Sequence, residues 1–205
     1  MVTQEPAATR STEPWLIVGL GNPGAEYART RHNVGAEVVE LLSERSDTRL
    51  RASKDNARSG DARIVGQRAT LAVPTTYMNE SGQAVGALLR RTGVALDHLV
   101  VIHDELDLEP GVVRVKEGGG LAGHNGLRSI TAHVHSQDYL RVRLGVGKPP
   151  GGKERGANHV LRGFAKSERP MIDEALERAA DAVELLLQFG LHRAMTETNG
   201  SSPAS

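Results

Sequence analysis

Two short polar stretches combine residue types that can move a proton. TRHNVG at 30–35 places His32 directly before an apolar run with helical spacing, and HDELD at 103–107 follows an apolar, strand-like run. Imidazole titrates near neutral pH, and a general base of this kind typically contributes about 10²- to 10⁴-fold in rate. Asp104 could accept one ring N–H, fix the tautomer and stabilise the imidazolium. The pair therefore predicts a histidine base supported by a carboxylate.

Each of these residues also has an ordinary structural interpretation. A lone histidine at a helix start often caps or packs, and the acids of HDELDLE also fit a plain acidic turn. The same acids are candidates for a hard-metal site, but such sites use several oxygen ligands and the sequence has no second acidic cluster, so we expect no metal. We expect Asn33 to serve the helix start.

Three amides could assist the proposed base. Asn22, Asn79 and Asn125 each lie beside a glycine or a tight turn, where asparagine is common for purely structural reasons. Each offers a carbonyl acceptor and an NH₂ donor. Three amides in one cleft would grip a peptide-like backbone and an oxyanion, and loss of one oxyanion donor typically costs about 3 to 4 kcal/mol.

Several common catalytic motifs are missing. The chain has no cysteine and no G-x-S-x-G elbow, and GGGLAGHNG at 118–126 lacks the Lys-Ser/Thr ending of a phosphate-binding loop. In GLGNPG the proline and the glycine spacing do not fit a dinucleotide fingerprint. Water activated by His32 is then the expected nucleophile, and the expected reaction is hydrolysis of an acyl bond without a metal or cofactor.

The elements that must position these residues alternate along the chain. Apolar runs and period-two alternation predict strands, and apolar spacing of three and four residues predicts helices. Interleaved strands and helices with one or two hairpins predict a single α/β domain with a mixed, mostly parallel sheet flanked by helices. The expected strands are 14–21, 62–66, 69–74, 98–106, 111–118 and 139–147, with a turn near Gly66 and Gln67. The expected helices are 34–42, 81–91 and 169–191, and the stretch 123–134 is expected to be a loop that leads into a helix.

Four polar clusters follow strands or turns, at 21–27, 77–82, 103–107 and 118–126. Ligands of open α/β sheets bind beyond the carboxyl ends of the strands, so all four clusters are expected to face one cleft. The segment 146–160 is rich in proline and glycine and carries Lys148, Lys153 and Arg155. It fits a lid or binding edge and equally fits plain surface irregularity.

Bulk composition sets limits on domains, partners and compartment. At 205 residues the chain suits one domain, expected at 14–195 between disordered tails at 1–13 and 196–205. Twenty-five basic and 25 acidic residues give no general attraction to polyanions, so nucleic-acid binding would need a local patch. The absence of cysteine, of a signal-peptide core and of a long apolar run predicts a cytoplasmic protein without a membrane partner.

The motifs together resemble the bacterial peptidyl-tRNA hydrolase family. The resemblance rests on LIVGLGNPGAEYARTRHNVG, PTTYMNESG, VIHDELDLEPGVVRVKEGGGLAGHNGLRSI and YLRVRLGVGKP, which occur in order between about Leu16 and Leu191. It implies a single α/β domain whose activity is cleavage of the ester between a peptide and the terminal ribose of tRNA. This activity would recycle tRNA from peptidyl-tRNA that is released prematurely from ribosomes or stalled on them. Stalled 50S ribosomal subunits are therefore an expected partner.

The resemblance also implies roles for individual residues. His32 would be the catalytic base, Asp104 the carboxylate that keeps it basic, and Asn22 the residue that separates N-blocked peptidyl from free aminoacyl substrates. Lys116 and Arg143 would clamp the 5′ phosphate of tRNA, which a neutral protein can do with a few well-placed cations. The positions expected to contact the acceptor end or the peptide, or to line or support the cleft, are Tyr27, Tyr77, Met78, Asn79, His124 and Asn125.

The chain departs from the family pattern at three places. Leu121 and Ala122 stand where the pattern often has a polar residue or glycine and then glycine, the loop 148–156 is of a variable kind, and residues 1–13 have no counterpart. Two other functions share these features, a non-catalytic RNA-binding adaptor and a metal-free esterase or peptidase for small substrates. An adaptor would lose His32 or Asp104, both of which are present, and a small-substrate enzyme would gain nothing from Lys116 and Arg143. Lacking a conspicuous apolar stripe, the chain is expected to be a monomer.

Overall fold

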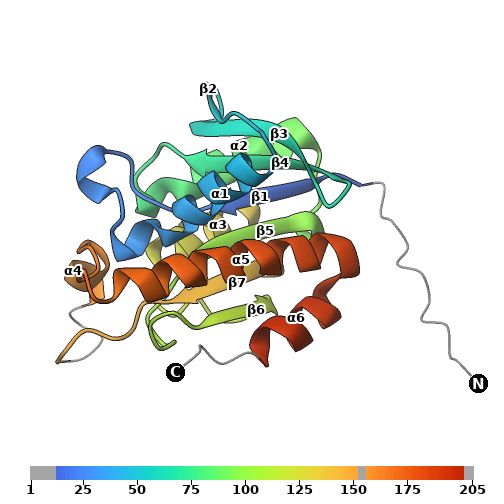
Figure 1. The fold of residues 1–205 in the computed structure, drawn as a ribbon. Helices are drawn as coiled ribbons and strands as arrows, with labels where there is room; N and C mark the ends of the chain where they lie inside the picture. Colours follow the sequence, from blue (N-terminus) through green and yellow to red (C-terminus); the bar gives the residue numbers. More distant parts are fainter. Residues whose placement is uncertain (1–12, 152–155, 201–205) are drawn as a thin grey trace, which may run out of the picture.

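The computed structural model describes residues 13–151 and 156–200. Its centre is one seven-stranded sheet in the order β2-β3-β4-β1-β5-β7-β6 (Figure 1). The four neighbours β4, β1, β5 and β7 run parallel, while β2, β3 and β6 are antiparallel to their partners. The strands are β1 Trp15–Gly19, β2 Arg51–Ser53, β3 Ala57–Ile64, β4 Gln67–Pro74, β5 Leu99–Glu105, β6 Val113–Glu117 and β7 Leu140–Gly145.

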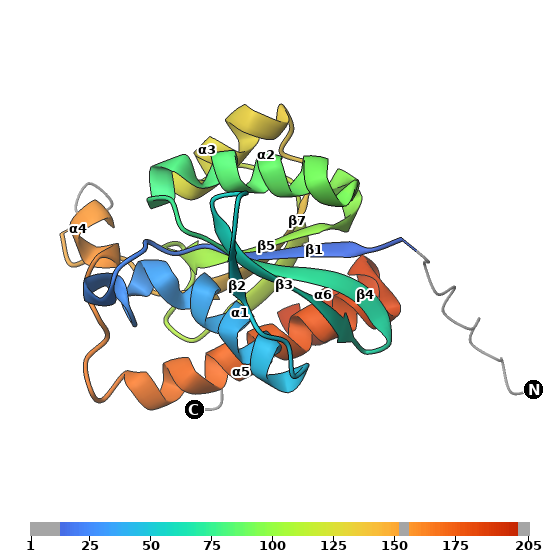
Figure 2. The same cartoon turned by 90° about the horizontal axis from the view of Figure 1, so that it is seen from above.

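Helices cover both faces of the sheet, so the predicted α/β class and mixed sheet are confirmed (Figure 2). α2 Ser81–Thr92 and α3 Asn125–Val134 pack on one face, and α1 Val34–Arg45, α5 Arg169–Phe189 and α6 Leu191–Asn199 pack on the other. The central strands β1 and β5 are buried along their whole length, which explains their continuous apolar sequences. The parallel strands β4, β1, β5 and β7 have their carboxyl ends on the same side of the sheet, and the loops that follow these ends meet there.

The hairpin of β3 and β4 differs from the prediction in length. Ile64 pairs with Gln67, so the turn is Val65–Gly66, and both residues have positive φ as a tight two-residue turn requires. β3 starts at Ala57, five residues earlier than expected, and β2 was not predicted. β2, at the edge of the sheet, and its neighbour β3 carry small and charged residues instead of an apolar run, because only part of their surface faces the core.

The C-terminal part also differs from the prediction. α5 ends at Phe189, Gly190 adopts φ +82°, and the chain continues as α6. Residues 196–199, expected in a disordered tail, form the last turn of α6 because its inner face is buried against the sheet edge. There Asn199 accepts a hydrogen bond from the Val115 amide at 2.8 Å and donates one to the Val115 carbonyl at 2.9 Å. The remaining tail predictions, at 1–12 and 201–205, lie outside the described residues.

The charged segment 146–160 contains a short helix, α4 Gly156–Val160, that was not predicted. Lys153 and Arg155 of the predicted loop lie outside the described residues. Within the described parts of the chain, every helix is too short or too polar to cross a membrane.

Candidate active site

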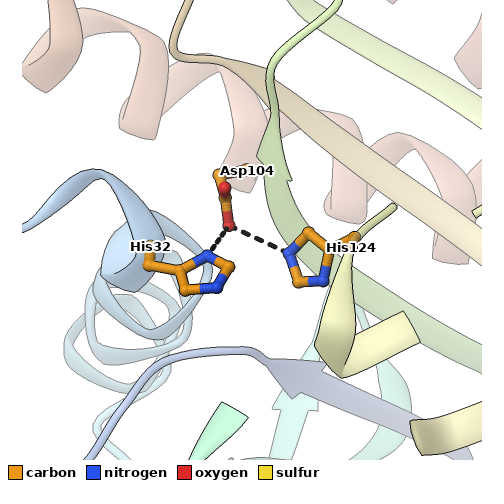
Figure 3. Close-up of side chains that lie close together, drawn as sticks. All are labelled: His32, Asp104 and His124. Carbon is orange, nitrogen blue, oxygen red and sulfur yellow. Dashed lines mark hydrogen bonds and ion pairs between the residues drawn. The ribbon is translucent and has the colours of Figure 1, made fainter. Parts of the chain in front are cut away.

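Three side chains from distant parts of the chain meet at the carboxyl end of β5. Asp104 lies near the end of that strand, His32 lies in a 3-10 turn at Arg31–Asn33 that leads into α1, and His124 precedes α3. One carboxylate oxygen of Asp104, Oδ1, is 2.7 Å from His32 Nδ1 and 3.0 Å from His124 Nε2 (Figure 3). All three residues are buried. The pairing of His32 with Asp104 is the contact that the sequence predicted.

Hydrogen bonding assigns the tautomers of both rings. The amides of Gly126 and Leu127 donate to His124 Nδ1, at 3.1 and 3.3 Å, so His124 carries its proton on Nε2 and donates it to Asp104. A carboxylate only accepts, so His32 also donates its Nδ1–H to Asp104. The Nε2 lone pair of His32 is then available to take a proton.

Asp104 remains ionised in this setting. Burial favours the neutral form, but the adjacent His32 and His124, through their charge and hydrogen bonds, hold the pKa of Asp104 well below its usual range. A carboxylate that stays charged stabilises the imidazolium that forms when His32 accepts a proton.

Contacts made by the nearby residues Gly35 and Arg31 hold His32 in position from both sides. On one side Gly35 packs against β5 so closely that a Cβ there would lie 2.1 Å from the Ile102 carbonyl oxygen. On the other side Arg31 donates to the Gly163 carbonyl at 2.6 Å, pairs with Glu168 at 3.1 Å and lies over the Phe164 ring. The 3-10 turn is therefore fixed between β5 and the segment that follows α4.

Asn22 is held by bonds to both its backbone and its side chain. The Asn33 amide accepts from the Asn22 N–H and donates to the Asn22 carbonyl, both at 2.9 Å. The Met78 N–H donates to Asn22 Oδ1 at 2.8 Å, which orients the amide and leaves Nδ2 as the remaining donor. Asn33 is the N-cap residue of α1, as expected, but its side-chain amide makes no capping bond and binds Asn22 instead.

A cavity of about 690 Å³ opens in front of His32, and all four predicted polar clusters contribute to its wall. Tyr27 and Tyr77 stand edge to face, with ring centroids 6.4 Å apart, and Tyr77 is 55% exposed. Asn125 Oδ1 accepts from Arg128 at 3.3 Å, so its Nδ2 is again the remaining donor. The predicted residues that line this cavity are Asn22, Tyr27, His32, Tyr77, Met78, Asn79, Asp104, His124 and Asn125.

Lys116 and Arg143 lie outside the cavity lining, on the neighbouring strands β6 and β7. Lys116 pairs in register with Arg141, and Arg143 with Arg114, so four cations share one face of the sheet. Burial and the adjacent Arg143 and Arg141 lower the pKa of Lys116. Arg143 lies 3.8 Å from Glu105, itself a cavity residue, so the cationic face adjoins the cavity.

Sequence reasoning missed part of the cavity wall. Glu105 was predicted only as one acid of a polar turn, not as a residue that lines the cavity. The helix α4, which supplies Gly156, Ala157 and Val160 to the wall, was not predicted from the local sequence pattern. Ala122 also lines the cavity and adopts φ +49°, a left-handed conformation that disfavours an L side chain. Ala122 is one of the positions at which the chain departs from the family pattern.

The His32, Asp104 and His124 ligand atoms lie within 4.8 Å of one another, close enough to hold a metal ion. Both nitrogens of His124 are already committed, however, since Nδ1 accepts helix amides and Nε2 donates to Asp104. A metal on this ring would have to displace one of these bonds. The cluster is therefore better suited to proton transfer than to metal binding.

Comparison with known proteins gives a consistent result. The family model for peptidyl-tRNA hydrolase matches residues 16–205. A peptidyl-tRNA hydrolase of Nocardia farcinica is 50% identical over 188 residues, which cover 91% of this chain and 97% of the relative. One from Anaeromyxobacter sp. strain K is 48% identical over 190 residues, 93% of this chain and 98% of the relative. The crystal structure of peptidyl-tRNA hydrolase from Acinetobacter baumannii superposes with a TM-score of 0.89 at 43% identity, covering 94% of this chain and 98% of that one.

Proposed function

Because this chain belongs to the peptidyl-tRNA hydrolase family, we propose that it hydrolyses the ester bond between a peptide, or an N-blocked aminoacyl group, and tRNA. The observation that best supports the proposed chemistry is the 2.7 Å contact between His32 Nδ1 and ionised Asp104 at the wall of a cavity. The product is a free tRNA that can be charged again.

The proposed reaction uses water as the nucleophile. His32 Nε2 removes a proton from water, whose oxygen attacks the ester carbonyl, and Asp104 stabilises the imidazolium through the Nδ1–H bond. When the intermediate collapses, the bond from the carbonyl carbon to the ribose oxygen breaks. The proton held by His32 passes to that ribose oxygen, which leaves His32 ready for another cycle.

We assign substrate discrimination to Asn22. Its Oδ1 is occupied by the Met78 amide, so Nδ2 is offered as a donor in the cavity. An N-blocked substrate has an amide carbonyl that accepts such a bond, whereas a free aminoacyl group has an ammonium that can only donate. This difference favours peptidyl-tRNA over aminoacyl-tRNA.

The other cavity residues would hold the two ends of the substrate. We assign the acceptor end and the peptide to the tyrosine pair and to Met78, Asn79 and Asn125, with His124 supporting Asp104. Lys116 and Arg143 would bind the 5′ phosphate of tRNA from their strand face. We further propose that the enzyme acts as a monomer in the cytoplasm, on free peptidyl-tRNA and on stalled 50S ribosomal subunits, and that its catalytic domain, predicted at 14–195, extends to the end of α6 at Asn199.

The proposal is tested by measuring release of N-acetyl-aminoacyl groups from tRNA by the wild type and by His32→Ala. Loss of the general base should lower kcat by about 10²- to 10⁴-fold. His192→Ala, which removes an exposed histidine on α6, should keep the wild-type rate. Equal rates for His32→Ala and wild type would contradict the role of His32. Absence of hydrolysis by the wild type would contradict the function itself.

A further inference from the structure

Arg141 is a fully buried arginine that the proposed mechanism does not use. It lies on β7, only 1% exposed, and its guanidinium rests 4.8 Å from the centroid of the Tyr139 ring. One terminal nitrogen donates to the Gly120 carbonyl and the other to the Gly119 carbonyl, both at 2.9 Å. A buried charge is costly unless it is well bonded, so a side chain of this kind needs a structural or functional reason.

The two carbonyls belong to the loop that delivers His124 and Asn125 to the cavity. Gly118 and Gly119 have φ of +59° and +86°, conformations that glycine alone adopts without strain. Because glycine is equally at ease in many other conformations, the sequence of this loop does not by itself select the observed one. The planar fork of Arg141 binds two successive carbonyls and so selects it.

The same loop also lies against the cationic face. Arg141 is the cross-strand partner of Lys116, and a Cβ on Gly119 would lie 2.9 Å from Lys116 Nζ. Farther along, the Leu121 carbonyl accepts the His124 N–H at 2.9 Å, and His124 then binds Asp104. A continuous set of contacts thus runs from Arg141 to the catalytic carboxylate.

We infer that Arg141 is a positioning residue for the reaction: by fixing the Gly119–Gly120 backbone it places His124 and Asn125 relative to Asp104. This inference rests on the proposed function. Displacement of reacting groups by about 1 Å can cost about 10²-fold in rate, so a residue that never touches the substrate can still affect turnover strongly. Lysine would keep the charge but could not bridge both carbonyls.

The test compares Arg141→Lys and Arg141→Met with wild type, at a temperature well below the melting point of each variant. Two substrates are used, N-acetyl-aminoacyl-tRNA and the N-acetyl-aminoacyl ester of adenosine, which lacks the tRNA body. We expect kcat to fall by about 10- to 100-fold on both substrates for both variants. The NMR signal of the His124 Nε2 proton should shift or broaden as its bond to Asp104 loosens.

Arg178→Met is the matched control. Arg178 of α5 also donates to a glycine carbonyl, that of Gly111 at 2.6 Å, but it does not line the cavity. Its loss should lower the melting temperature without changing kcat or the His124 signal.

Two results would overturn the inference. One is a folded Arg141→Met variant with wild-type kcat and an unchanged His124 signal, and the other is full recovery of kcat in Arg141→Lys. If Arg141→Met does not fold, Arg141→Lys still tests the inference. A lower kcat in the lysine variant supports positioning, and wild-type kcat shows that the positive charge alone is enough. Failure of the wild type to hydrolyse either ester would instead count against the proposed function, and the His124 signal would still report on positioning.

Discussion

Asp104 accepts hydrogen bonds from two imidazoles on the same carboxylate oxygen. The two rings have different tasks, since His124 is locked by the amides at the start of α3 and only His32 keeps a free Nε2 lone pair. The second ring adds a donor to the buried carboxylate and helps to keep it ionised. Charge at Asp104, and not merely its shape, is therefore what His32 needs.

Asp104→Asn tests this requirement for charge. An asparagine carbonyl can still accept from His32, so the geometry should largely persist, but a neutral amide cannot stabilise the imidazolium. We expect kcat to fall by about 10²- to 10⁴-fold with little change in KM, measured on N-acetyl-aminoacyl-tRNA. An effect confined to KM would show that Asp104 binds substrate instead of supporting the base.

His103 is a buried neighbour of this cluster with a pH-dependent role in stability. It donates from Nδ1 to the Asp104 carbonyl at 2.7 Å, and burial together with the nearby His124 lowers its pKa well below the usual value. The native state thus keeps His103 neutral, while the unfolded chain protonates it below about pH 6.5. Its contribution to stability is full above that pH and is lost as the pH falls.

His103→Asn should flatten this pH dependence, because the asparagine NH₂ keeps the bond to the Asp104 carbonyl but does not titrate. We expect wild type to lose up to about 1.4 kcal/mol of unfolding free energy per pH unit from this group, and the variant to lack that contribution. Urea unfolding at pH 7.5, 6.5 and 5.5 measures it. Parallel curves for wild type and variant would show that another group is responsible.

Residue types predicted the contact between His32 and Asp104 but not the residues that support it. His32 and Asp104 were found because their chemistry is rare and their surroundings are distinctive. The contacts of Asn33 and Arg141 were not, since each side chain binds the backbone of a residue 11 or 21 positions earlier in the chain. Backbone groups are the same in every residue, so the sequence carries no local mark of such contacts.

At the scale of elements, prediction succeeded for strands buried on both faces and for long helices with one apolar face. β1 and β5 were predicted from their apolar runs, and α1, α2 and α5 from their apolar spacing. β2, α4 and α6 were missed, because a short element with one partly buried face leaves too few apolar residues to show a period. The site inherits this limit, as α4 forms part of the cavity wall.

The contact of α1 with the sheet sets the position of His32, the proposed base, and Gly35→Ala tests it. The new methyl group would lie 2.1 Å from the Ile102 carbonyl oxygen, which is backbone and cannot rotate away, so α1 must shift. We expect a loss of about 3 kcal/mol in unfolding free energy and a lower kcat, because His32 precedes this residue by one turn. Chemical unfolding and steady-state kinetics measure the two effects.

Gly86→Ala in α2 is the control for this change. Its new methyl would lie 3.3 Å from the flexible end of Arg90 and 3.8 Å from His133 Cβ, an ordinary van der Waals contact, so helix propensity should dominate. A gain of about 0.5 to 1 kcal/mol with unchanged kcat is expected. Similar behaviour of the two variants would mean that close approach at Gly35 does not position His32.

At the scale of the whole molecule, a net charge of zero must be reconciled with a polyanionic substrate. The net charge is zero, but positive side chains gather at one place on the sheet. Four of them lie on one face at the β6 edge, namely Arg114, Lys116, Arg141 and Arg143. Arg141 is turned inward onto the loop, which leaves the other three as the source of local potential beside the cavity. Affinity for tRNA should then depend on few phosphate contacts and only weakly on salt.

Lys116→Ala measures how much of that affinity one cation supplies. If Lys116 binds the tRNA 5′ phosphate, its loss should raise KM for N-acetyl-aminoacyl-tRNA by about tenfold, equivalent to about 1.4 kcal/mol. The slope of log KM against log salt should fall by about 0.7 to 0.9, measured between 50 and 200 mM. Hydrolysis of the adenosine ester, which lacks that phosphate, should not change. Lys54→Ala removes an exposed cation at the opposite edge of the sheet and should alter neither quantity. Equal effects of Lys116→Ala on both substrates would show that Lys116 contacts the ester end of the substrate in the cavity and does not bind the 5′ phosphate of tRNA.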